Sequence, residues 1–155
     1  MRPLRVYVDT SVFGGLFDPE FDVDTRVFFD AVNAGRFHLV VSDQVTKEID
    51  RSPQRVRNFF GSYFPQMDLL KDSTEVQQLA DSYLRDKILT PKSWTDASHV
   101  AYATIHSCVG LVSWNYRHIV HEDKCMLFNV VNASQGYPPL FIADPREILN
   151  HGQER

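Results

Sequence analysis

The sequence alternates short apolar segments with longer segments of helical periodicity, and this alternation restricts the fold more than any other feature. The apolar segments are rich in valine, leucine and isoleucine and end at polar or turn-forming residues, as buried strands do. We expect strands at residues 4–8, 37–41, 67–70, 111–113 and 140–143. Because alternating strands and helices form right-handed βαβ units, the sequence predicts an α/β fold, a three-layer α/β/α sandwich with a mostly parallel sheet of four to five strands.

The segments between the expected strands carry apolar residues at helical spacing and begin at residues that can cap a helix. Ser42 is placed to cap a short helix that carries Glu48. Thr95 is placed to cap a longer helix over residues 96–106, in which one apolar stripe faces the core. Glu48 and Asp96 are therefore expected on helices rather than in loops.

Length and composition are those of an ordinary globular domain. The 155 residues are 43% hydrophobic and 23% charged, and no linker or repeat divides them, so we expect one domain over 1–150 and a frayed tail over 151–155. The two cysteines, Cys108 and Cys125, form no framework, and no apolar run approaches the length of a membrane span. We therefore expect reduced thiols and a cytoplasmic location.

The net charge limits how the chain could hold nucleic acid. A formal charge of −4 and a pI of about 5.8 argue against binding through a broad basic surface. They do not exclude a nuclease, since bound divalent cations change the sign of the field around carboxylates. Arg51, Arg55 and Arg57 form one local basic cluster, which either guides a phosphate backbone or is a solvated helix face.

Four polar residues follow or border the expected strands. Asp9 directly follows the first strand, Asn115 follows the fourth, and Glu48 and Asp96 lie on helices beside strand ends. Taken singly, each has a plainer role as a cap, a turn residue or a solvated helical side chain. Together they are expected at the carboxyl edge of a parallel sheet, where such folds bind ligands. Oxygen ligands of this kind suit Mg²⁺ or Mn²⁺, whereas zinc would call for a histidine or cysteine pair at ligand spacing.

In five segments the sequence resembles the ordered motifs of PIN domains, and most closely the VapC-like branch. These segments are Asp9 with Thr10 and Ser11, and residues 42–49, 96–103, 111–119 and 144–149. The resemblance covers nearly the whole chain, and its specificity lies in the order and spacing of the motifs. It implies an α/β/α fold with a parallel sheet and the activity of a metal-dependent ribonuclease. In the VapC-like branch it also implies a toxin that a partner antitoxin inhibits.

The resemblance assigns roles to individual residues. It implies that Asp9, Glu48 and Asp96 are the acids that bind Mg²⁺ or Mn²⁺. Asn115 occupies the position where many members carry a fourth acid, so an amide oxygen would coordinate or position a water there without adding charge. Ser11 matches the hydroxyl residue often found two positions after the first acid. In-line attack by water on RNA would leave a 5′-phosphate and a 3′-hydroxyl.

Other conspicuous residues near these motifs have two interpretations each. His99 lies one turn after Asp96 and is either a packed core histidine or a contact to substrate or bound water. Arg117 and His118 follow Asn115 and either meet phosphate or belong to a plain surface loop. Trp114 is expected to pack in the core or its rim rather than to stack on a base.

The first half of the chain is unusually rich in aromatic residues. Phe28, Phe29 and the segment 59–64 place aromatic side chains on more than one helix face, a surplus that often marks an interface. In VapC-like proteins an antitoxin segment docks near such helices and the toxins commonly dimerise. We therefore expect an antitoxin partner and a homodimer.

Two alternatives to the ribonuclease are open at this point. The first is a catalytically weakened module of the same fold that binds RNA or a protein partner, which Asn115 and the acidic pI favour. The second is a phosphatase of the haloacid dehalogenase type, suggested by an aspartate after the first strand. That class requires a second acid two residues later, where this chain has Ser11.

Overall fold

A five-stranded sheet forms the centre of the protein. The computed structural model describes residues 2–151 of the chain. All neighbouring strands pair in parallel, in the order β3-β2-β1-β4-β5. The strands are β1 (Leu4–Val8), β2 (Phe37–Ser42), β3 (Asp68–Leu70), β4 (Gly110–Val112) and β5 (Phe141–Ala143). Each lies within one residue of the predicted strand at both ends, and the predicted parallel sheet is confirmed.

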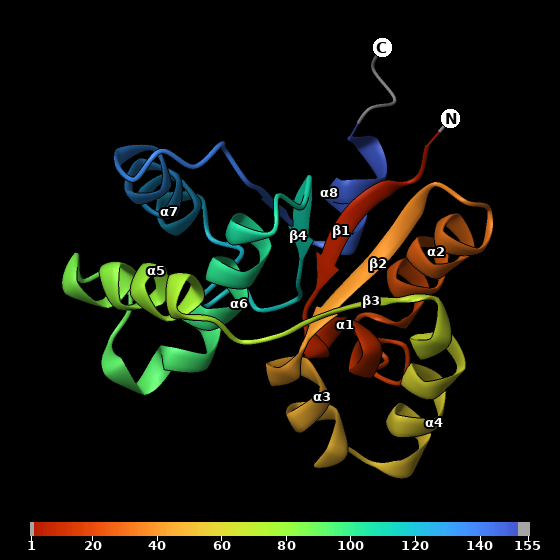
Figure 1. The fold of residues 1–155 in the computed structure, drawn as a ribbon. Helices are drawn as coiled ribbons and strands as arrows, with labels where there is room; N and C mark the ends of the chain where they lie inside the picture. The colour runs from red at the N-terminus through yellow and green to blue at the C-terminus, as the bar shows by residue number, and fades with distance from the viewer. Residues whose placement is uncertain (1, 152–155) are drawn as a thin grey trace.

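Helices cover both faces of this sheet and complete the predicted three-layer sandwich (Figure 1). One layer contains α5, α6 and α7, and the other contains α1, α2 and α8 with α3 and α4 beside α1. The bounds are α1 (Thr10–Gly15), α2 (Asp22–Asn33), α3 (Asp43–Asp50), α4 (Gln54–Tyr63), α5 (Thr74–Arg85), α6 (Trp94–Ile105), α7 (Glu122–Ser134) and α8 (Pro145–Asn150). Two short 3-10 turns, η1 (Phe64–Gln66) and η2 (Pro91–Ser93), precede β3 and α6.

The central strands are buried because both faces of the sheet are covered. Val6 and Val8 of β1, Val40 of β2 and Leu111 of β4 have no exposed surface. Strands of this kind are apolar on both faces, and this explains why they appear in the sequence as continuous apolar runs rather than alternating ones. The rigid centre of the sheet therefore holds the residues that follow β1 and β4.

The starts of two helices test the capping predictions. Ser42 caps α3 as predicted, with its Oγ accepting a hydrogen bond from the backbone N–H of Val45. The predicted cap at Thr95 is wrong, because α6 begins one residue earlier, at Trp94. The chain enters α6 directly from the 3-10 turn, so no extended residue places a side-chain oxygen over the first turn. The short helix α1 was not predicted.

The aromatic surplus of the first half is used inside the molecule. Phe29 packs against Phe59 at a centroid distance of 4.8 Å, and Phe13 packs against Phe60 at 5.0 Å. These rings join α1, α2 and α4 into one cluster, in which Phe28 and Phe29 are buried and Phe64 is 37% exposed. The number of aromatic residues is thus explained by core packing, and the homodimer stays a prediction.

The remaining sequence expectations concern the chain ends and the thiols. Cys108 is buried, Cys125 is half-buried and both are free, in agreement with reduced thiols. His151, the first residue of the expected frayed tail, stacks on Phe141 at 4.7 Å, and residues 152–155 lie outside the described part of the chain. Among residues 2–151, none of the helices is long and apolar enough to cross a membrane.

Candidate metal-binding active site

The candidate site lies where the order of the strands reverses. The chain builds β1, β2 and β3 outward in one direction and then returns to place β4 and β5 on the other side of β1. In open α/β sheets a ligand crevice forms at such a reversal, outside the carboxyl ends of the strands. Asp9 directly follows β1 and Ser113 directly follows β4. The Ser113 hydroxyl donates to Oδ2 of Asp9 at 2.7 Å, which joins the two sides of the crevice.

The Asp9 carboxylate is held on one oxygen and faces the crevice with the other. It occupies the N-cap position of α1 but makes no side-chain capping bond. Its Oδ2 accepts hydrogen bonds from Ser11 at 2.9 Å and from Ser113 at 2.7 Å. Its Oδ1 lies 3.5 Å from Nε2 of His99. The plain capping role is therefore excluded for Asp9, and Ser11 lies in the site as a support for that acid.

Glu48 reaches the same crevice from α3, the helix that follows β2. Oε1 accepts from the Thr10 hydroxyl at 2.5 Å, and Oε2 accepts from the Gln44 amide at 3.2 Å. Nε2 of His99 lies 3.1 Å from Oε1. Burial opposes ionisation of this carboxyl, but the hydrogen bond and charge of His99 outweigh burial and lower the pKa of Glu48. Glu48 is thus an ionised member of the site rather than a solvated helical side chain.

His99 lies on α6, three residues after Asp96. It is both a packed core residue and a neighbour of the acids, the two interpretations that the sequence left open. Its side chain is only 1% exposed, so it is packed in the core. Its Nε2 nevertheless faces Glu48 and Asp9, while its Nδ1 lies 2.6 Å from the Tyr7 hydroxyl. Burial lowers the pKa of the imidazole, yet the surrounding carboxylates raise it by more, with the Glu48 hydrogen bond first among them. The sequence signal for this residue was its helical spacing from Asp96.

Three of these side chains fit a divalent cation. Asp9, Glu48 and His99 each offer one ligand atom, and the three atoms all lie within 4.8 Å of one another. Two carboxylates and one imidazole are ligand types that Mg²⁺, Mn²⁺ and related ions accept. The acids also lie in each other's negative field, which a cation would relieve. Two of the three predicted ligands, Asp9 and Glu48, therefore lie in a group whose donor types fit a divalent cation, and His99 is its third member in place of Asp96.

Asp96 and Asn115 form a second pair at the edge of this group. Nδ2 of Asn115 donates to Oδ1 of Asp96 at 3.1 Å, and Oδ1 of Asn115 accepts from the backbone N–H of His118 at 3.0 Å. A backbone N–H can only donate, so it fixes which end of the amide faces Asp96. One lone pair of the Asn115 oxygen is thus used by His118, and the expected contact of that oxygen with a metal or a water stays a prediction.

Asp96 lies outside the compact group of three but inside its electric field. Burial raises the pKa of the Asp96 carboxyl, and the negative charges of Asp9 and Glu48 add to this against the effect of His99. The structure therefore places Asp9 and Glu48 together, and Asp96 lies near enough for their charges to act on it.

Two residues from the same motifs lie away from the acids. Arg117 is exposed on the loop after β4 and takes part in no ion pair among residues 2–151. Trp114 is buried, stacks on Phe21 at a centroid distance of 4.4 Å and donates its Nε1–H to Thr25 at 2.9 Å. The predicted packing role of Trp114 is confirmed.

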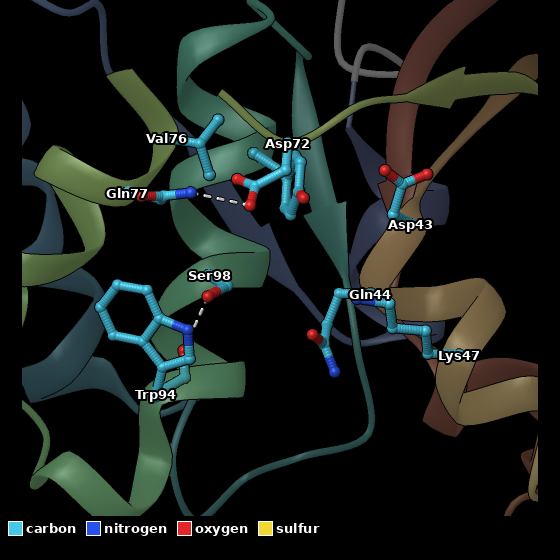
Figure 2. Close-up of a pocket in the computed structure, with 9 residues that line it drawn as sticks. Asp43, Gln44, Lys47, Asp72, Val76, Gln77, Trp94 and Ser98 are labelled. Carbon is cyan, nitrogen blue, oxygen red and sulfur yellow. Dashed lines mark hydrogen bonds between the residues drawn. The ribbon is translucent and has the colours of Figure 1, made fainter. Parts of the chain in front are cut away.

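A small polar cavity adjoins the acids between α3, α5 and α6 (Figure 2). Its volume is about 70 Å³, and Gln44 from α3 faces Trp94 of α6 across it (Figure 2). Lys47 and Asp72 also line it. Because Gln44 also donates to Glu48, the cavity and the acidic group share one side chain. Sequence patterns gave no indication of the roles of Gln44, Thr10, Tyr7 or Ser113; only the position of Ser113 directly after a strand could have suggested it.

Comparison with known proteins identifies the fold. No protein-family model matches the chain, and no curated protein matches it in sequence. Among solved structures it is similar to VapBC2 from Rickettsia felis bound to a promoter DNA fragment, at 12% identity and a TM-score of 0.58, over 91% of this chain and 98% of that one. It is also similar to FitAcB from Neisseria gonorrhoeae, at 12% identity and a TM-score of 0.58, over 90% and 97% of the two chains.

A third similar structure is VapC20 of Mycobacterium tuberculosis, described as a toxin that cleaves the sarcin–ricin loop. Here the identity is 11% and the TM-score 0.54, over 88% of this chain and 98% of that one. At such identities the likeness establishes the fold alone. The chain therefore has the α/β/α fold of the VapC- and FitB-type PIN-domain toxins, the fold that its motifs predicted.

Proposed function

We propose that this protein is a metal-dependent endoribonuclease that hydrolyses RNA phosphodiester bonds. The observation that carries the proposal is the meeting of Asp9, Glu48 and His99 beside Asp96, at the point where the strand order reverses. These side chains come from three places in the fold, the end of β1, α3 and α6. Hydrogen bonds from Ser11, Ser113, Thr10 and Gln44 hold the carboxylates of Asp9 and Glu48 in place.

The roles of the residues follow from their contacts. Asp9 and Glu48 would hold Mg²⁺ or Mn²⁺, each through an oxygen that faces the crevice. A bound divalent ion would supply charge stabilisation at the phosphoryl oxygens and a water of lowered pKa. Asp96, which lies near these two acids, would take the proton of the attacking water. Asn115 would orient Asp96 by holding Oδ1 and leaving Oδ2 for the proton.

We also propose that the protein is the toxin of a toxin–antitoxin pair. The similar structure of VapBC2 is a complex bound to a promoter DNA fragment, and VapC20 is described as a toxin that cleaves the sarcin–ricin loop. A protein of this type would have RNA as its substrate and a small antitoxin protein as its partner. This proposal would be supported by a short open reading frame directly upstream of the gene. Its product should copurify with this chain and stop RNA cleavage. A freely active chain with no such neighbour would argue for a housekeeping nuclease.

A cleavage assay on total RNA tests the nuclease directly. We expect the wild-type protein to cut RNA in Mg²⁺ or Mn²⁺ and to stop in excess chelator, with 5′-phosphate and 3′-hydroxyl ends on the products. Asp96→Asn removes the proposed base with little change in volume, so cleavage should be lost. Asp30→Asn is the matched control, because Asp30 is an exposed aspartate on α2. Cleavage by Asp96→Asn at the wild-type rate would contradict the assignment.

Thermal melting tests the metal site without any substrate. A ligand that binds only the folded protein stabilises it by RT ln(1 + [L]/Kd), about 2.7 kcal/mol at one hundred times Kd. We therefore expect Mn²⁺ to raise the melting temperature of the wild type and of Asp30→Asn. A melting temperature indifferent to both Mn²⁺ and Mg²⁺ would favour the weakened binding module over the nuclease.

A further inference from the structure

We propose that His99 is itself a nitrogen ligand of the divalent-metal site, held in the ligating orientation by Tyr7 and Ser42, and that it makes the site prefer Mn²⁺ to Mg²⁺. The inference rests on the proposed function and adds a residue and a metal preference to it. The simpler alternative is that His99 only forms a buried ion pair with Glu48.

The spacing of the donor atoms favours ligation. Nε2 of His99 lies 3.1 Å from one Glu48 oxygen, 3.3 Å from the other and 3.5 Å from Oδ1 of Asp9. Neighbouring ligands of an octahedral ion with bonds of about 2.1 Å lie about 3 Å apart. An ion pair needs only one short contact, whereas here the imidazole nitrogen stands at ligand spacing from two carboxylates on different elements.

The other hydrogen bonds of Asp9 and Glu48 do not block their contacts with His99. Ser11 and Ser113 both bind Oδ2 of Asp9, so Oδ1 alone faces His99. Thr10 and Gln44 bind the two Glu48 oxygens from the side of α1 and of α3 itself. The four hydrogen bonds therefore fix the two carboxylates separately, and Nε2 of His99 is the group that contacts both of them.

The far side of the imidazole is tied down as ligating histidines are. Metal-bound histidines almost always donate their second ring N–H to a fixed acceptor, which sets the tautomer and the ring orientation. Nδ1 of His99 lies 2.6 Å from the Tyr7 hydroxyl, which lies 2.6 Å from the Ser42 hydroxyl. All three side chains are buried. Ser42 is fixed in turn as the cap of α3, through Val45.

This chain of hydroxyls can serve either tautomer. A hydroxyl both donates and accepts, so Tyr7 can donate to Nδ1 or accept from it while Ser42 adjusts in the opposite sense. When Nε2 is a ligand, Nδ1–H donates to Tyr7 and the Tyr7 hydroxyl donates to Ser42. In this arrangement the Nε2 lone pair is free, and Nδ1 and the two hydroxyl oxygens each keep a hydrogen-bond partner.

The nitrogen ligand sets the metal preference. Mg²⁺ favours an all-oxygen environment, whereas imidazole suits first-row transition ions. A site of two carboxylates and one imidazole should therefore bind Mn²⁺ more tightly than Mg²⁺. Removing the imidazole should narrow that ratio rather than weaken both ions equally, which distinguishes a ligand from a residue that only supports the fold.

Pulsed electron paramagnetic resonance on the Mn²⁺-loaded protein tests the ligand directly. We expect coupling of Mn²⁺ to ¹⁴N in the wild type, and its replacement by ¹⁵N coupling when the protein is grown with ¹⁵N-labelled histidine. The coupling should disappear in His99→Gln and persist in His38→Gln, whose histidine pairs with Asp68 on the surface. If His99→Gln does not fold, the labelled His118→Gln protein decides, since His118 is the other histidine whose charge acts on Asp96; loss of the coupling in that variant would overturn the assignment to His99.

Binding measurements with Mn²⁺ and Mg²⁺ complete the test. We expect His99→Gln to reduce the ratio of the Mg²⁺ to the Mn²⁺ dissociation constant by about tenfold or more. Tyr7→Phe should retain the nitrogen coupling and weaken Mn²⁺ binding by about 10- to 100-fold, the usual cost of losing a histidine's partner. Mn²⁺ bound without nitrogen coupling would overturn this inference and leave the proposed nuclease site intact. Failure to bind either ion would overturn both.

Discussion

Asp9 and Asp144 occupy equivalent positions, between a strand and the next helix, but make different contacts. Each is a buried aspartate that directly follows a strand of the sheet, β1 and β5 respectively, and each stands at the N-cap of the next helix. Asp144 makes a full capping box, with its carboxylate accepting from the N–H groups of Arg146 and Glu147. Asp9 makes no side-chain cap and turns its carboxylate to Ser11, Ser113 and His99.

The difference lies in what surrounds the second oxygen of each carboxylate. In Asp144 the oxygen Oδ2 is taken by the Tyr116 hydroxyl at 2.7 Å and by the Arg146 guanidinium at 3.3 Å. In Asp9 the oxygen Oδ1 faces an imidazole and, beyond it, another carboxylate. A strand-end aspartate whose oxygens are all satisfied stabilises a fold, and one with an oxygen left to face other acids can bind an ion.

The largest expected contrast between the two aspartates is in catalysis. Asp9→Asn should lower the rate of RNA cleavage by at least about 100-fold, because losing a direct ligand costs more than the 10- to 100-fold of losing a ligand's partner. Asp144→Asn should cleave at close to the wild-type rate below its melting temperature. The comparison fails if the two variants lose activity to a similar degree. The metal-free melting temperature of Asp9→Asn should not fall, since the substitution removes a negative charge from the acidic group.

The next contrast is in stability, and here Asp144 should dominate. Asp144→Ala removes an N-cap, worth about 1 kcal/mol, and leaves the Tyr116 hydroxyl without its acceptor. We expect the free energy of unfolding in urea to fall by about 1–3 kcal/mol, with Asp30→Ala as the exposed control. A loss no greater than that of the control would mean that the capping box contributes little.

A third test concerns the support of Asp9 rather than the acid itself. Ser113→Ala removes one of the two hydroxyls that hold Oδ2 and leaves Ser11 in place. We expect the Mn²⁺ dissociation constant, measured by calorimetry, to rise by about tenfold, at the low end of the usual cost of losing a ligand's partner. Unchanged affinity would show that Ser11 alone positions the carboxylate.

The smallest effect is a pH dependence confined to Asp144. Burial opposes its ionisation, but the hydrogen bonds from Tyr116 and the Glu147 N–H, with the charge of Arg146, lower the pKa of Asp144 overall. A lowered folded pKa means that its contribution to stability is present above about pH 3.9 and is lost as pH falls through the folded value. The stability difference between wild type and Asp144→Asn should therefore narrow from pH 6 to pH 3 in urea unfolding. A difference that stayed constant would rule out this charge as its source.

The sequence was sufficient for the sheet because the covered strands are short, apolar and sharply bounded. It also anticipated that Asp9 and Glu48 lie close together, since the segments that follow adjacent parallel strands begin at one edge of the sheet. It could not assign His99, because a buried histidine on an apolar helix face has the same local pattern whether or not it faces acids. Nor could it separate Asp9 from Asp144, since both have the local pattern of a capping residue.

The cap of α6 was predicted at the wrong residue and the hydrogen bonds of Asn115 were not predicted, for a related reason. The predicted Thr95 cap assumed an extended residue before the helix, and the 3-10 turn that replaces it has no distinct sequence signature. The role of the Asn115 oxygen depended on whether a backbone N–H lay within reach, and His118 provides one. The cap of α6 and the hydrogen bonds of Asn115 both depend on the backbone geometry at single peptide groups. The spacing of apolar residues in the sequence does not predict that geometry.

The locked amide of Asn115 has a consequence for how this position can change during evolution. With its oxygen committed to a peptide N–H, an aspartate substituted there would keep that bond and turn its other oxygen toward Asp96, where an N–H now points. Two carboxylates would then face each other without a shared proton or ion. Gaining an acid here would therefore carry a penalty unless residue 96 or the bound ions changed with it, so the two positions are expected to vary as a pair among descendants of this chain.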